Sequence, residues 1–540
     1  MRNILIGGAW PYANGSLHIG HIASLLPGDL LARYHRAAGD NVYFVSGSDC
    51  HGTPVAIRAK QENRTPHEVS SHYHEEFSEC FEKLGFSFDV YTKTSAKEHK
   101  DFVREFHKKL YESPYVYEKE AEQVFCESCD TFLADRFVLG KCPKCGQDAR
   151  GDQCDACGMV LEPEALVEPV CAVCGKAIGF RKSKHLYIAI SKLQKELKQL
   201  VDGHPEWRKN AIAFTNRYIS EGLRDRALTR DLEWGIEVPR KGYENKTIYI
   251  WAENVLGYLS ASKMAADARN GDFCALWGKE AKHYYVHGKD NIPFHTIILP
   301  ALLLGNNEGW HLPDQIISSE YLTLEGKKIS TSHNYAIWVK DLLSSYEADS
   351  IRYFFIANGP EKKDADFSWR EYVHSHNGEL LGAYGNFVNR TLAFIQKYFG
   401  GVVPRGEDDR DTNKRIDDLY AVAGKLIESG CFKDAMNEIF EFVRNANKFF
   451  DTEQPWVTRN TDIAACSHTL YLCVQIIANL AVLLLPFLPF SSEKVIKWLN
   501  VSAEWERQSV SGGYCLPEIE ILFQRIDKKV IEIETKKWKD

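Results

Sequence analysis

The sequence predicts an α/β protein in which a parallel, doubly wound sheet is split by a cysteine-rich insertion and followed by an all-α bundle. Three observations predict this architecture. Short apolar runs alternate with helical patterns over residues 1–117 and again over 181–320, which favours parallel strands joined by helices. Eight of the fifteen cysteines fall between these two halves. Helical periodicity with little strand signal fills residues 371–540, after a linking segment at 321–370.

Length, charge and cysteine usage set bounds on the function. A chain of 540 residues can hold two to four domains, and its net charge of −8 does not exclude a nucleic-acid partner, which needs only a local basic face. No long apolar segment precedes Trp10, so no signal peptide is expected. Residues 471–490 approach the length of a membrane span, but the prolines and amides within them predict a buried bundle helix. Clustered cysteines favour metal binding in a reducing cytoplasm over disulfides.

The first candidate site follows the first predicted strand, an apolar run at residues 3–7 that leads into a helical pattern over about 17–36. The start of that helix directs free backbone N–H groups and a positive dipole at the strand end, which suits a phosphate. His18 and His21 would share one face there, and Gly20 would let a flat ligand lie close to the backbone. The residues between strand and helix include types typical of turns and N-caps: Pro11, Asn14, Gly15 and Ser16.

The string Pro-Tyr-Ala-Asn-Gly-Ser-Leu-His-Ile-Gly-His, residues 11–21, resembles the His-Ile-Gly-His signature of class I aminoacyl-tRNA synthetases. The resemblance implies a Rossmann-type catalytic domain in which His18 and His21 stabilise the phosphates of ATP, with Gly20 at the same site, as an amino acid is activated. The alternative is two ordinary histidines beside a helix cap. The length of the matching string favours the catalytic interpretation.

A carboxylate lies at the end of the second predicted strand, residues 41–45. Asp49 could pair with an ammonium group at this strand end, or it could cap a helix over 51–60. The surrounding Asp-x-His-Gly-Thr-Pro string resembles methionyl-tRNA synthetases, in which this aspartate holds the α-amino group of the substrate. The resemblance therefore implies that Asp49 binds the amino group of methionine.

Four Cys-x-x-Cys pairs lie in the insertion, residues 118–180, and glycine follows the second cysteine at Gly146, Gly158 and Gly175. Each pair places two thiolates on one side of a tight turn, and two pairs close a tetrahedral zinc site. The sequence leaves open whether one or two zinc ions bind, and no ligand position is open for catalysis, so the metal is expected to be structural. A zinc-knuckle insertion at this point also resembles methionyl-tRNA synthetases. The short central loop favours one site made of Cys142, Cys145, Cys154 and Cys157, nested inside a possible second made of Cys126, Cys129, Cys171 and Cys174.

The second half of the catalytic domain carries three further landmarks: residues 229–239 before a predicted strand at 248–251, residues 251–258, and residues 287–295. Trp251 and Tyr258, seven apart, would lie on one helix face, which by itself is usually core. The resemblance implies an ATP site with Glu237 and Asp290 at the ribose and Gly288 beside them. It also implies a methionine pocket, whose aromatic walls suit a polarizable thioether with a donor such as Tyr258 or His295. Its predicted members are Trp10, Pro11, Tyr12, Trp251, Asn254, Tyr258 and His295.

Residues 322–332 look like the second class I signature, Lys-Met-Ser-Lys-Ser, a mobile loop that closes over the triphosphate. Lys328 would supply positive charge where pyrophosphate leaves, with Ser330 and Thr331 beside the ATP, and Gly326 would act as a hinge. Thr331 occupies the place of the second lysine of the signature. Lys327, one residue before Lys328, is the candidate substitute.

Helices predicted near 371–399, 413–429, 431–451, 462–485 and 491–499 favour an antiparallel bundle, and residues 523–540 a basic helix returning to the catalytic half. Asn386 and Arg390 share one helix face, and Trp456 follows a proline at a helix end. On their own they would be an exposed polar face and a ring packed at a cap. The resemblance implies that they read the CAU anticodon by stacking and hydrogen bonds to base edges.

Taken together, the motifs resemble those of methionyl-tRNA synthetases. The resemblance implies a methionine–tRNA ligase that forms methionyl-adenylate from L-methionine and ATP with Mg²⁺ and transfers the methionyl group to tRNA(Met), initiator and elongator. The expected protein is a cytoplasmic monomer with no membrane contact. The alternatives are another class I synthetase for a bulky apolar amino acid and a non-catalytic tRNA-binding paralogue. Pocket details depart from the family pattern at Ala252, Asn254, Val255 and Arg226, so methionine selectivity and inhibitor sensitivity stay open.

Overall fold

A five-stranded parallel sheet forms the centre of the catalytic half in the computed structural model, which describes residues 1–133, 137–151, 154, 156–157, 159, 161, 163–331 and 334–537. All neighbouring strands are parallel, as the alternation of strands and helices predicts. The sheet places the carboxyl ends of its strands at one edge, where ligands bind in such folds. In spatial order the strands are β14 (Gln315–Ser319), β13 (Ala281–Gly288), β1 (Asn3–Gly8), β2 (Asn41–Ser48) and β3 (Val90–Lys93).

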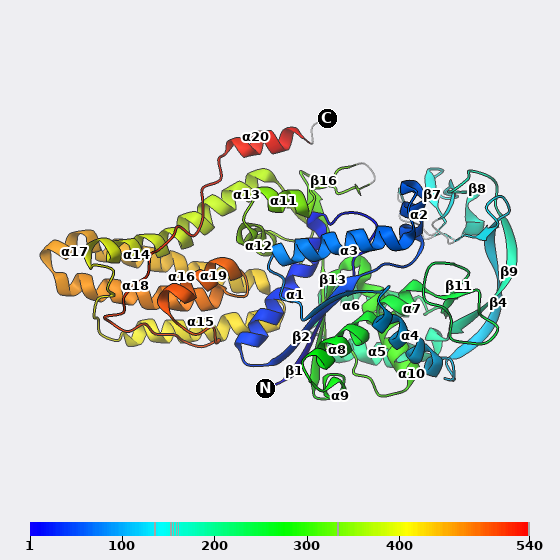
Figure 1. The fold of residues 1–540 in the computed structure, drawn as a ribbon, viewed down its shortest axis with the longest axis horizontal. Coiled ribbons are helices and arrows are strands. Elements are labelled where there is room, and N and C mark those ends of the chain that lie inside the picture. The colour runs from blue at the N-terminus through cyan, green and yellow to red at the C-terminus, as the bar shows by residue number, and fades with distance from the viewer. Residues whose placement is uncertain are drawn as a thin grey trace.

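Helices pack against this sheet and provide several of the site residues (Figure 1). The predicted strand at 248–251 is only partly correct: β12 (Thr247–Ile248) stops early and α7 begins at Ile250. Trp251 and Tyr258 consequently lie on two successive short helices and not on one. The helices of this half are α1 (Ile19–Ala37), α2 (Thr53–Glu62), α3 (Pro66–Lys83), α4 (Lys97–Leu110), α5 (Gln194–Gly203), α6 (Lys209–Ser220), α7 (Ile250–Asn254), α8 (Gly257–Ala268), α9 (Phe273–Leu276) and α10 (Leu299–Asn306).

The cysteine-rich insertion is an arm that extends away from the sheet (Figure 1). Two long antiparallel strands, β4 (Val116–Cys126) and β9 (Gly179–Ile188), form its stem. A small sheet lies at its far end, made of β6 (Val138–Lys141), β7 (Asp148–Arg150) and β8 (Val167–Cys171). Both stem strands start or end outside the predicted 118–180 range, because the ladder continues down to the catalytic body.

The bundle is helical as predicted, and its core helix is α18 (Ile463–Leu484). That helix is long and apolar enough to cross a membrane by length and composition, but 83% of its apolar window is buried inside the protein. Its two amides are satisfied, since Gln475 and Asn479 hydrogen-bond the backbone of Val510 and Gln508. The other helices are α13 (Trp369–Ser375), α14 (Asn386–Tyr398), α15 (Arg410–Glu428), α16 (Phe432–Glu453), α17 (Pro455–Thr461) and α19 (Pro489–Leu499), with a π-helix at His376–Gly385.

The linking segment holds a three-stranded sheet and two helices between the halves. The sheet consists of β15 (Leu322–Leu324), β16 (Lys327–Lys328) and β17 (Ala365–Phe367), and the helices are α11 (Val339–Ser345) and α12 (Ala348–Ala357). The predicted tail helix is shorter than expected: α20 spans Lys529–Lys536, and residues 538–540 lie outside the described residues. It runs back along the bundle toward the linking segment and packs on α13 (Figure 1).

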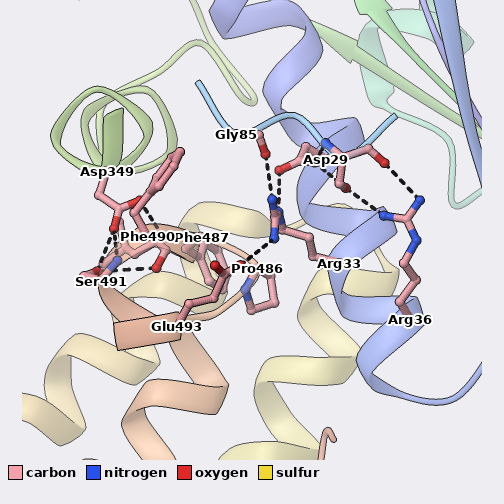
Figure 2. A network of polar contacts seen from close by, with 12 residues as sticks. Asp29, Arg33, Arg36, Gly85, Asp349, Pro486, Phe487, Phe490, Ser491 and Glu493 are labelled. Carbon is pink, nitrogen blue, oxygen red and sulfur yellow. Dashed lines mark hydrogen bonds and ion pairs between the residues drawn. The ribbon is translucent and has the colours of Figure 1, made fainter. Parts of the chain in front are cut away.

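One buried arginine joins the bundle to α1. Arg352, on α12, donates to Asp29 on α1 (2.6 Å), to the Leu84 carbonyl (3.1 Å) and to the carbonyls of Pro486 and Phe487 at the turn before α19 (both 2.9 Å). Figure 2 shows Asp29, Arg33 and the 486–487 turn converging on this point. Both Arg352 and Asp29 are fully buried, so the pair is a fixed part of the junction.

Candidate active site

The two signature histidines cap the first helix and hold each other in place. His18, and not an upstream turn residue, is the N-cap of α1: its Nδ1 accepts from the Gly20 backbone N–H (3.1 Å). His21 Nδ1 accepts from the His18 backbone N–H (3.1 Å), so the two form a reciprocal capping box. An Nδ1 that accepts leaves the proton of a neutral ring on Nε2. Both imidazoles therefore present Nε2–H as a donor at the positive end of the helix.

Both histidines are neutral near pH 7. Burial lowers the pKa of His21 to about 4, and burial together with the neighbouring His21 lowers the pKa of His18 well below its usual range. The ring centroids are 4.1 Å apart, as expected of side chains on one face. Two neutral donors can bind a phosphate oxygen by hydrogen bonds without repelling each other.

The structure gives a reason for glycine at position 20 that the sequence did not indicate. A Cβ at Gly20 would lie 2.8 Å from the His18 ring, so glycine is needed for His18 to fold back over the helix start. The sequence prediction left the space above this backbone for a flat ligand, but the His18 ring fills it. A role of Gly20 at the ATP site thus acts through the position of His18.

Asp49 lies at the carboxyl end of β2, next to the signature segment. Its backbone bridges to residues 11–13, through Asp49 N–H to the Pro11 carbonyl and Ala13 N–H to the Asp49 carbonyl, both 2.8 Å. The cap alternative is wrong, because α2 begins at Thr53 behind Gly52 and has no side-chain cap. Burial raises the pKa of Asp49 well above its usual range, with a smaller contribution from the charge of Glu253. A cation beside this carboxylate would remove that penalty.

Trp10 lies in a slot between two glycines from distant parts of the chain. A Cβ at Gly47 on β2 or at Gly257 on α8 would each lie 2.5 Å from the Trp10 indole. Any side chain at either position would displace the ring. These two glycines carry no motif signal, and only the tertiary fold brings them against Trp10.

In the predicted pocket, Tyr258 and His295 hydrogen-bond each other, and His295 also hydrogen-bonds the backbone. His295 Nδ1 contacts the Asn291 carbonyl (2.8 Å) and must donate to it, so its Nε2 accepts from the Tyr258 hydroxyl (2.7 Å). Burial lowers the pKa of His295 to about 4, which keeps the ring neutral. Both donors that the sequence suggested for the thioether are consequently used inside the protein. Neither group is left as a donor to a ligand in this arrangement.

The other predicted pocket residues make contacts of their own. His295 lies in a π-helix, Phe294–Ile298, a form common at functional sites. The Trp251 ring packs on Phe294 (4.7 Å between centroids). Pro11 is buried and Tyr12 partly buried, and Asn254 hydrogen-bonds Asp49. Of the positions that depart from the family pattern, Ala252 and Val255 are buried and Arg226 is exposed on β10 (Arg226–Ala227).

The segment after β13 is tied to the strand that leads to the lysine loop. Asp290 accepts from the Tyr321 hydroxyl, and Lys289 binds Glu320 (2.8 Å) and Asp364 (2.9 Å) while lying 3.6 Å from the Tyr321 ring. Asp290 is exposed at the carboxyl edge of the sheet, where a ribose can reach it.

The second carboxylate predicted at the ribose has a different partner. Glu237 is exposed and pairs with Arg104 on α4 (3.1 Å). Gly288 ends β13 with Ser24 of α1 close by, 3.4 Å from a Cβ built at the glycine. This contact places Gly288 one turn beyond the signature histidines.

The lysine loop begins as a tight hairpin, which corrects the proposed hinge. Glu325 (φ 47°) and Gly326 (φ 78°) both have positive φ, the geometry of a type I′ turn between β15 and β16. The turn is anchored, because the Gly326 N–H donates to Asp366 (2.8 Å) and Glu325 accepts from the Trp369 N–H (2.9 Å). Gly326 is therefore a hydrogen-bonded turn residue in this structure and not a free hinge.

The two lysines alternate along β16. Successive side chains of a strand point to opposite faces, so Lys327 and Lys328 lie on opposite sides of the hairpin. Lys327 Nζ lies 5.8 Å from the Tyr335 ring, and Ser330 pairs with Tyr335 through two backbone hydrogen bonds of 2.9 Å. Thr331 is exposed, and the signature position 332 lies outside the described residues.

The far end of the loop is joined directly to the histidine signature. Ile19 N–H donates to the Ile337 carbonyl (3.1 Å), and Val339 N–H donates to the Leu17 carbonyl (2.8 Å). His18 and Trp338 thus form an antiparallel bridge. The two signatures, more than 300 residues apart in the sequence, are thus joined through residues 337–339, which begin five residues after the second signature.

The eight cysteines form two clusters with the predicted nested pairing. Cys126, Cys129, Cys171 and Cys174 form one, and Cys142, Cys145, Cys154 and Cys157 the other, with all sulfur atoms of a cluster within 4.8 Å of one another. Thiolates on a tetrahedral zinc, at Zn–S distances of about 2.3 Å, lie about 3.8 Å apart, and the described sulfur contacts of 3.5–3.8 Å fit this.

The knuckle turns explain the glycines that follow these pairs. Gly146 and Gly175 have positive φ (71° and 69°), which the turns require, and Gly158 is outside the described residues. Each cluster supplies four sulfur ligands, a complete tetrahedral set that fits structural zinc.

The predicted anticodon residues lie on α14 and α17, and α17 is at the end of the bundle far from the sheet (Figure 1). Arg390 on α14 binds Asp451 (2.7 Å) and the Asn447 carbonyl (2.8 Å), and lies 4.2 Å from the Phe450 ring. Trp456, at the start of α17, is 45% exposed, and its ring lies 6.1 Å from the Phe450 ring. Asn386 is exposed one turn before Arg390. A half-exposed aromatic ring and polar side chains are groups of the kind that bind unpaired bases.

Comparison with known proteins agrees with this geometry. The family model described as "tRNA synthetases class I (M)" matches residues 4–392, and the model "Anticodon binding domain of methionyl tRNA ligase" matches residues 403–539. Methionine–tRNA ligase 1 of Alkaliphilus oremlandii is 54% identical over 538 residues, covering 99% of both chains. Methionine–tRNA ligase 1 of Bacillus cereus is 53% identical over 539 residues, again covering 99% of each.

A solved structure supports the fold independently. The structure of Mycobacterium tuberculosis methionyl-tRNA synthetase bound by methionyl-adenylate superposes with a TM-score of 0.81, covering 97% of this chain and all of that one, at 22% identity. The full-length relatives, the two family models and the joined signatures lead to one conclusion: the chain belongs to the methionyl-tRNA synthetase family of class I, the ligases that attach methionine to tRNA.

Proposed function

We propose that the chain carries out methionine–tRNA ligation with the residues of the joined signatures and the pocket beside them. In the first step the methionine carboxylate attacks the α-phosphate of MgATP, giving methionyl-adenylate and pyrophosphate. In the second step the terminal ribose hydroxyl of tRNA(Met), initiator or elongator, takes the methionyl group and AMP leaves. No side chain is modified, so rate enhancement comes from positioning and electrostatics.

One observation carries the proposal: backbone hydrogen bonds hold His18 and His21 as Nε2–H donors, and residues 337–339, just after the lysine loop, are hydrogen-bonded to the same turn. Phosphate bound at the helix start would accept from both rings. The loop segment before Ile337 would close over the same phosphates. Negative charge that develops during adenylate formation then meets donors already in position.

The ATP and methionine sites share this edge of the sheet. Asp49 would pair with the substrate ammonium group, and an aromatic pocket would hold the thioether. Glu237 and Asp290 would bind the ribose, Gly20 and Gly288 would permit close packing at the nucleotide, and Lys328, Ser330 and Thr331 would contact the phosphates. The proposed pocket residues are Trp10, Pro11, Tyr12, Trp251, Asn254, Tyr258 and His295.

The arm and the bundle serve structure and tRNA binding in this proposal. Each cysteine cluster would hold one zinc ion, which fixes the arm without taking part in chemistry. Asn386, Arg390 and Trp456 would read the anticodon. We further propose that the protein is a cytoplasmic monomer, in keeping with cysteines that form thiol clusters suited to metal.

Methionine-dependent exchange of pyrophosphate into ATP tests the first step. We expect exchange with methionine and none with leucine, isoleucine or valine. His18→Ala and His21→Ala should each lower the rate at least about 100-fold, about 2.7 kcal/mol of barrier. His67→Ala, at an exposed histidine of α3, is the matched control. Exchange driven by another amino acid, or none at all, would contradict the assignment; the second outcome supports a non-catalytic tRNA-binding protein.

The lysines require a separate test because Thr331 replaces the second one. Lys328→Ala and Lys327→Ala should both slow activation, and Thr331→Lys should compensate for loss of Lys327. If Lys327→Ala changes the activation rate by less than about twofold, under ~0.5 kcal/mol, Lys327 is not the substitute.

A further inference from the structure

A second buried carboxylate lies behind Asp49, and the roles assigned so far do not use it. Glu253, on α7, is fully buried and its Oε1 contacts His51 Nδ1 in a hydrogen-bonded pair. His51 is 1% exposed and lies two residues after Asp49, whose Oδ1 accepts from the His51 backbone N–H (3.3 Å). Asn254, next to Glu253, hydrogen-bonds Asp49. Residues 49–51 and 253–254 thus face each other through two side-chain contacts.

The other titratable groups around this pair offer little compensating charge. His99 on α4 is buried with Nε2 3.9 Å from Glu253 Oε1, and burial, with the charges of His51 and Lys100, lowers its pKa to about 3. Its Nδ1 pairs with Ser260 (2.8 Å). Lys100 lies toward the outside, 5.9 Å from the Trp234 ring that packs edge-on against His51. His51 is consequently the group placed to balance Glu253.

Several polar atoms of the cluster are buried without a hydrogen-bond partner. Within the part of the chain that the structure describes, no hydrogen bond reaches Glu253 Oε2, His51 Nε2, His99 Nε2 or Trp10 Nε1, although all four are buried. Buried polar groups without partners are rare in folded proteins and cost free energy. Four such atoms on residues in contact with one another distinguish this cluster from an apolar core.

Charge balance then decides what the pair does. Two ionised carboxylates in one buried chamber repel, and the charge of Glu253 adds to the burial that raises the pKa of Asp49. A partner that balances Glu253 weakens this repulsion and leaves Asp49 better able to attract an ammonium group.

We propose that His51 and Glu253 form a positioning pair in which His51 neutralises Glu253, so that Asp49 is the carboxylate left ionised for the amino group of methionine. This inference rests on the proposed role of Asp49 and adds two residues to amino-group recognition. Neither touches the reacting phosphorus; both act through Asp49. The geometry predicts an asymmetry: losing His51 harms methionine binding more than losing Glu253, because only the first loss leaves an unbalanced carboxylate.

The test is a double-mutant cycle on the full-length protein, read as KM values in pyrophosphate exchange. His51→Gln should raise KM for methionine at least about tenfold and leave KM for ATP within about twofold. Glu253→Gln should stay within about threefold for methionine. The double variant H51Q/E253Q, a neutral hydrogen-bonded pair, should recover most of the loss. A double variant no better than His51→Gln would overturn the proposal and indicate a structural role.

A second readout isolates the amino group. L-methioninol and 4-(methylthio)butan-1-ol differ only in that group, so the ratio of their inhibition constants measures its recognition. The ratio should fall toward 1 in His51→Gln and return in the double variant. If His51→Gln fails to fold, which thermal melting would show, Glu253→Gln decides alone: an increase above about fivefold in KM for methionine would mean that Glu253 itself binds the ammonium group and would overturn the proposal.

Asp49→Asn separates this inference from its premise. If that variant leaves KM for methionine and the inhibitor ratio unchanged, the proposed role of Asp49 is wrong. If Asp49→Asn raises KM while His51→Gln does not, the role of Asp49 stands and the pairing is wrong.

Discussion

Replacement of Arg352 by methionine is expected to loosen the junction between the bundle and α1. The substitution keeps a side chain of similar length but removes the guanidinium that reaches Asp29 and three backbone carbonyls. Removing one partner of a buried ion pair costs roughly 3–5 kcal/mol. Asp29 retains Arg33 (2.9 Å) and the Ser87 N–H and hydroxyl (both 2.7 Å), so we expect the lower end, about 3 kcal/mol.

The assay is urea unfolding at pH 7, followed by fluorescence and circular dichroism, with hydrogen exchange of α1 and of residues 484–490. Lys362→Met is the matched control: its ion pair with Asp434 (2.7 Å) joins side chains that are each about half exposed, so it should cost less than about 0.5 kcal/mol. Asp29→Asn in the Arg352→Met background should recover part of the loss, since it removes the charge left behind. A loss below about 1 kcal/mol for Arg352→Met, or equal losses for both variants, would refute the reasoning.

Lowering the pH should also weaken the contact between Asp29 and Arg352. Burial alone would raise the pKa of Asp29, but Arg352, Arg33 and Ser87 outweigh it and hold the pKa below its usual range. A carboxylate with a lowered folded pKa contributes stability above its unfolded pKa of about 3.9 and loses it as pH falls through the folded value. In Arg352→Met the folded pKa moves up, so this contribution should shrink at neutral pH and its acid loss should begin at higher pH.

Three further outcomes are expected. Replacing Cys126 and Cys129 by serine should lower bound zinc from two ions per chain to one in metal analysis; loss of both or of neither would disprove separate sites. Gly257→Ala would place a new Cβ against the Trp10 indole, so it should raise KM for methionine about tenfold and leave KM for ATP unchanged. The control Gly203→Ala, which has open space around it, should alter neither KM. Trp456→Ala should remove ~1–3 kcal/mol of base stacking and so lower kcat/KM for tRNA charging roughly 5- to 150-fold, without changing pyrophosphate exchange. An equal loss in both assays would contradict an anticodon role.

Local signals explain which features were predictable from the sequence. His18 and His21 were placed correctly because a strand, a turn and a helix start follow one another within about twenty residues, and each leaves its own residue pattern. The cysteine pairing was also predictable, since the short loop between Cys145 and Cys154 brings the inner two knuckles together first. In both cases the chain itself limits the distance between the groups.

Other features depend on contacts between distant segments. Gly47 and Gly257 look like unremarkable glycines until the fold places them on either side of Trp10, and Glu253 reads as one acidic residue in a short helix until it meets His51. The hinge assigned to Gly326 was wrong for a different reason. A glycine in a loop permits movement or a tight turn equally well, and only the positive φ of the preceding residue and the hydrogen bond to Asp366 distinguish them.

The anchors of the lysine loop and of α1 together restrict how the site can close. The loop is held upstream by the turn on Asp366 and downstream by the bridge of Ile337 and Val339 to residues 17–19. A movement of α1 would therefore also move the downstream end of the loop. The same movement would act on the bundle, because α1 carries Asp29 and the buried Arg352 ties it to the turn before α19. The sites proposed for ATP at His18 and for tRNA at Trp456 thus lie in parts of the protein that are connected through one helix.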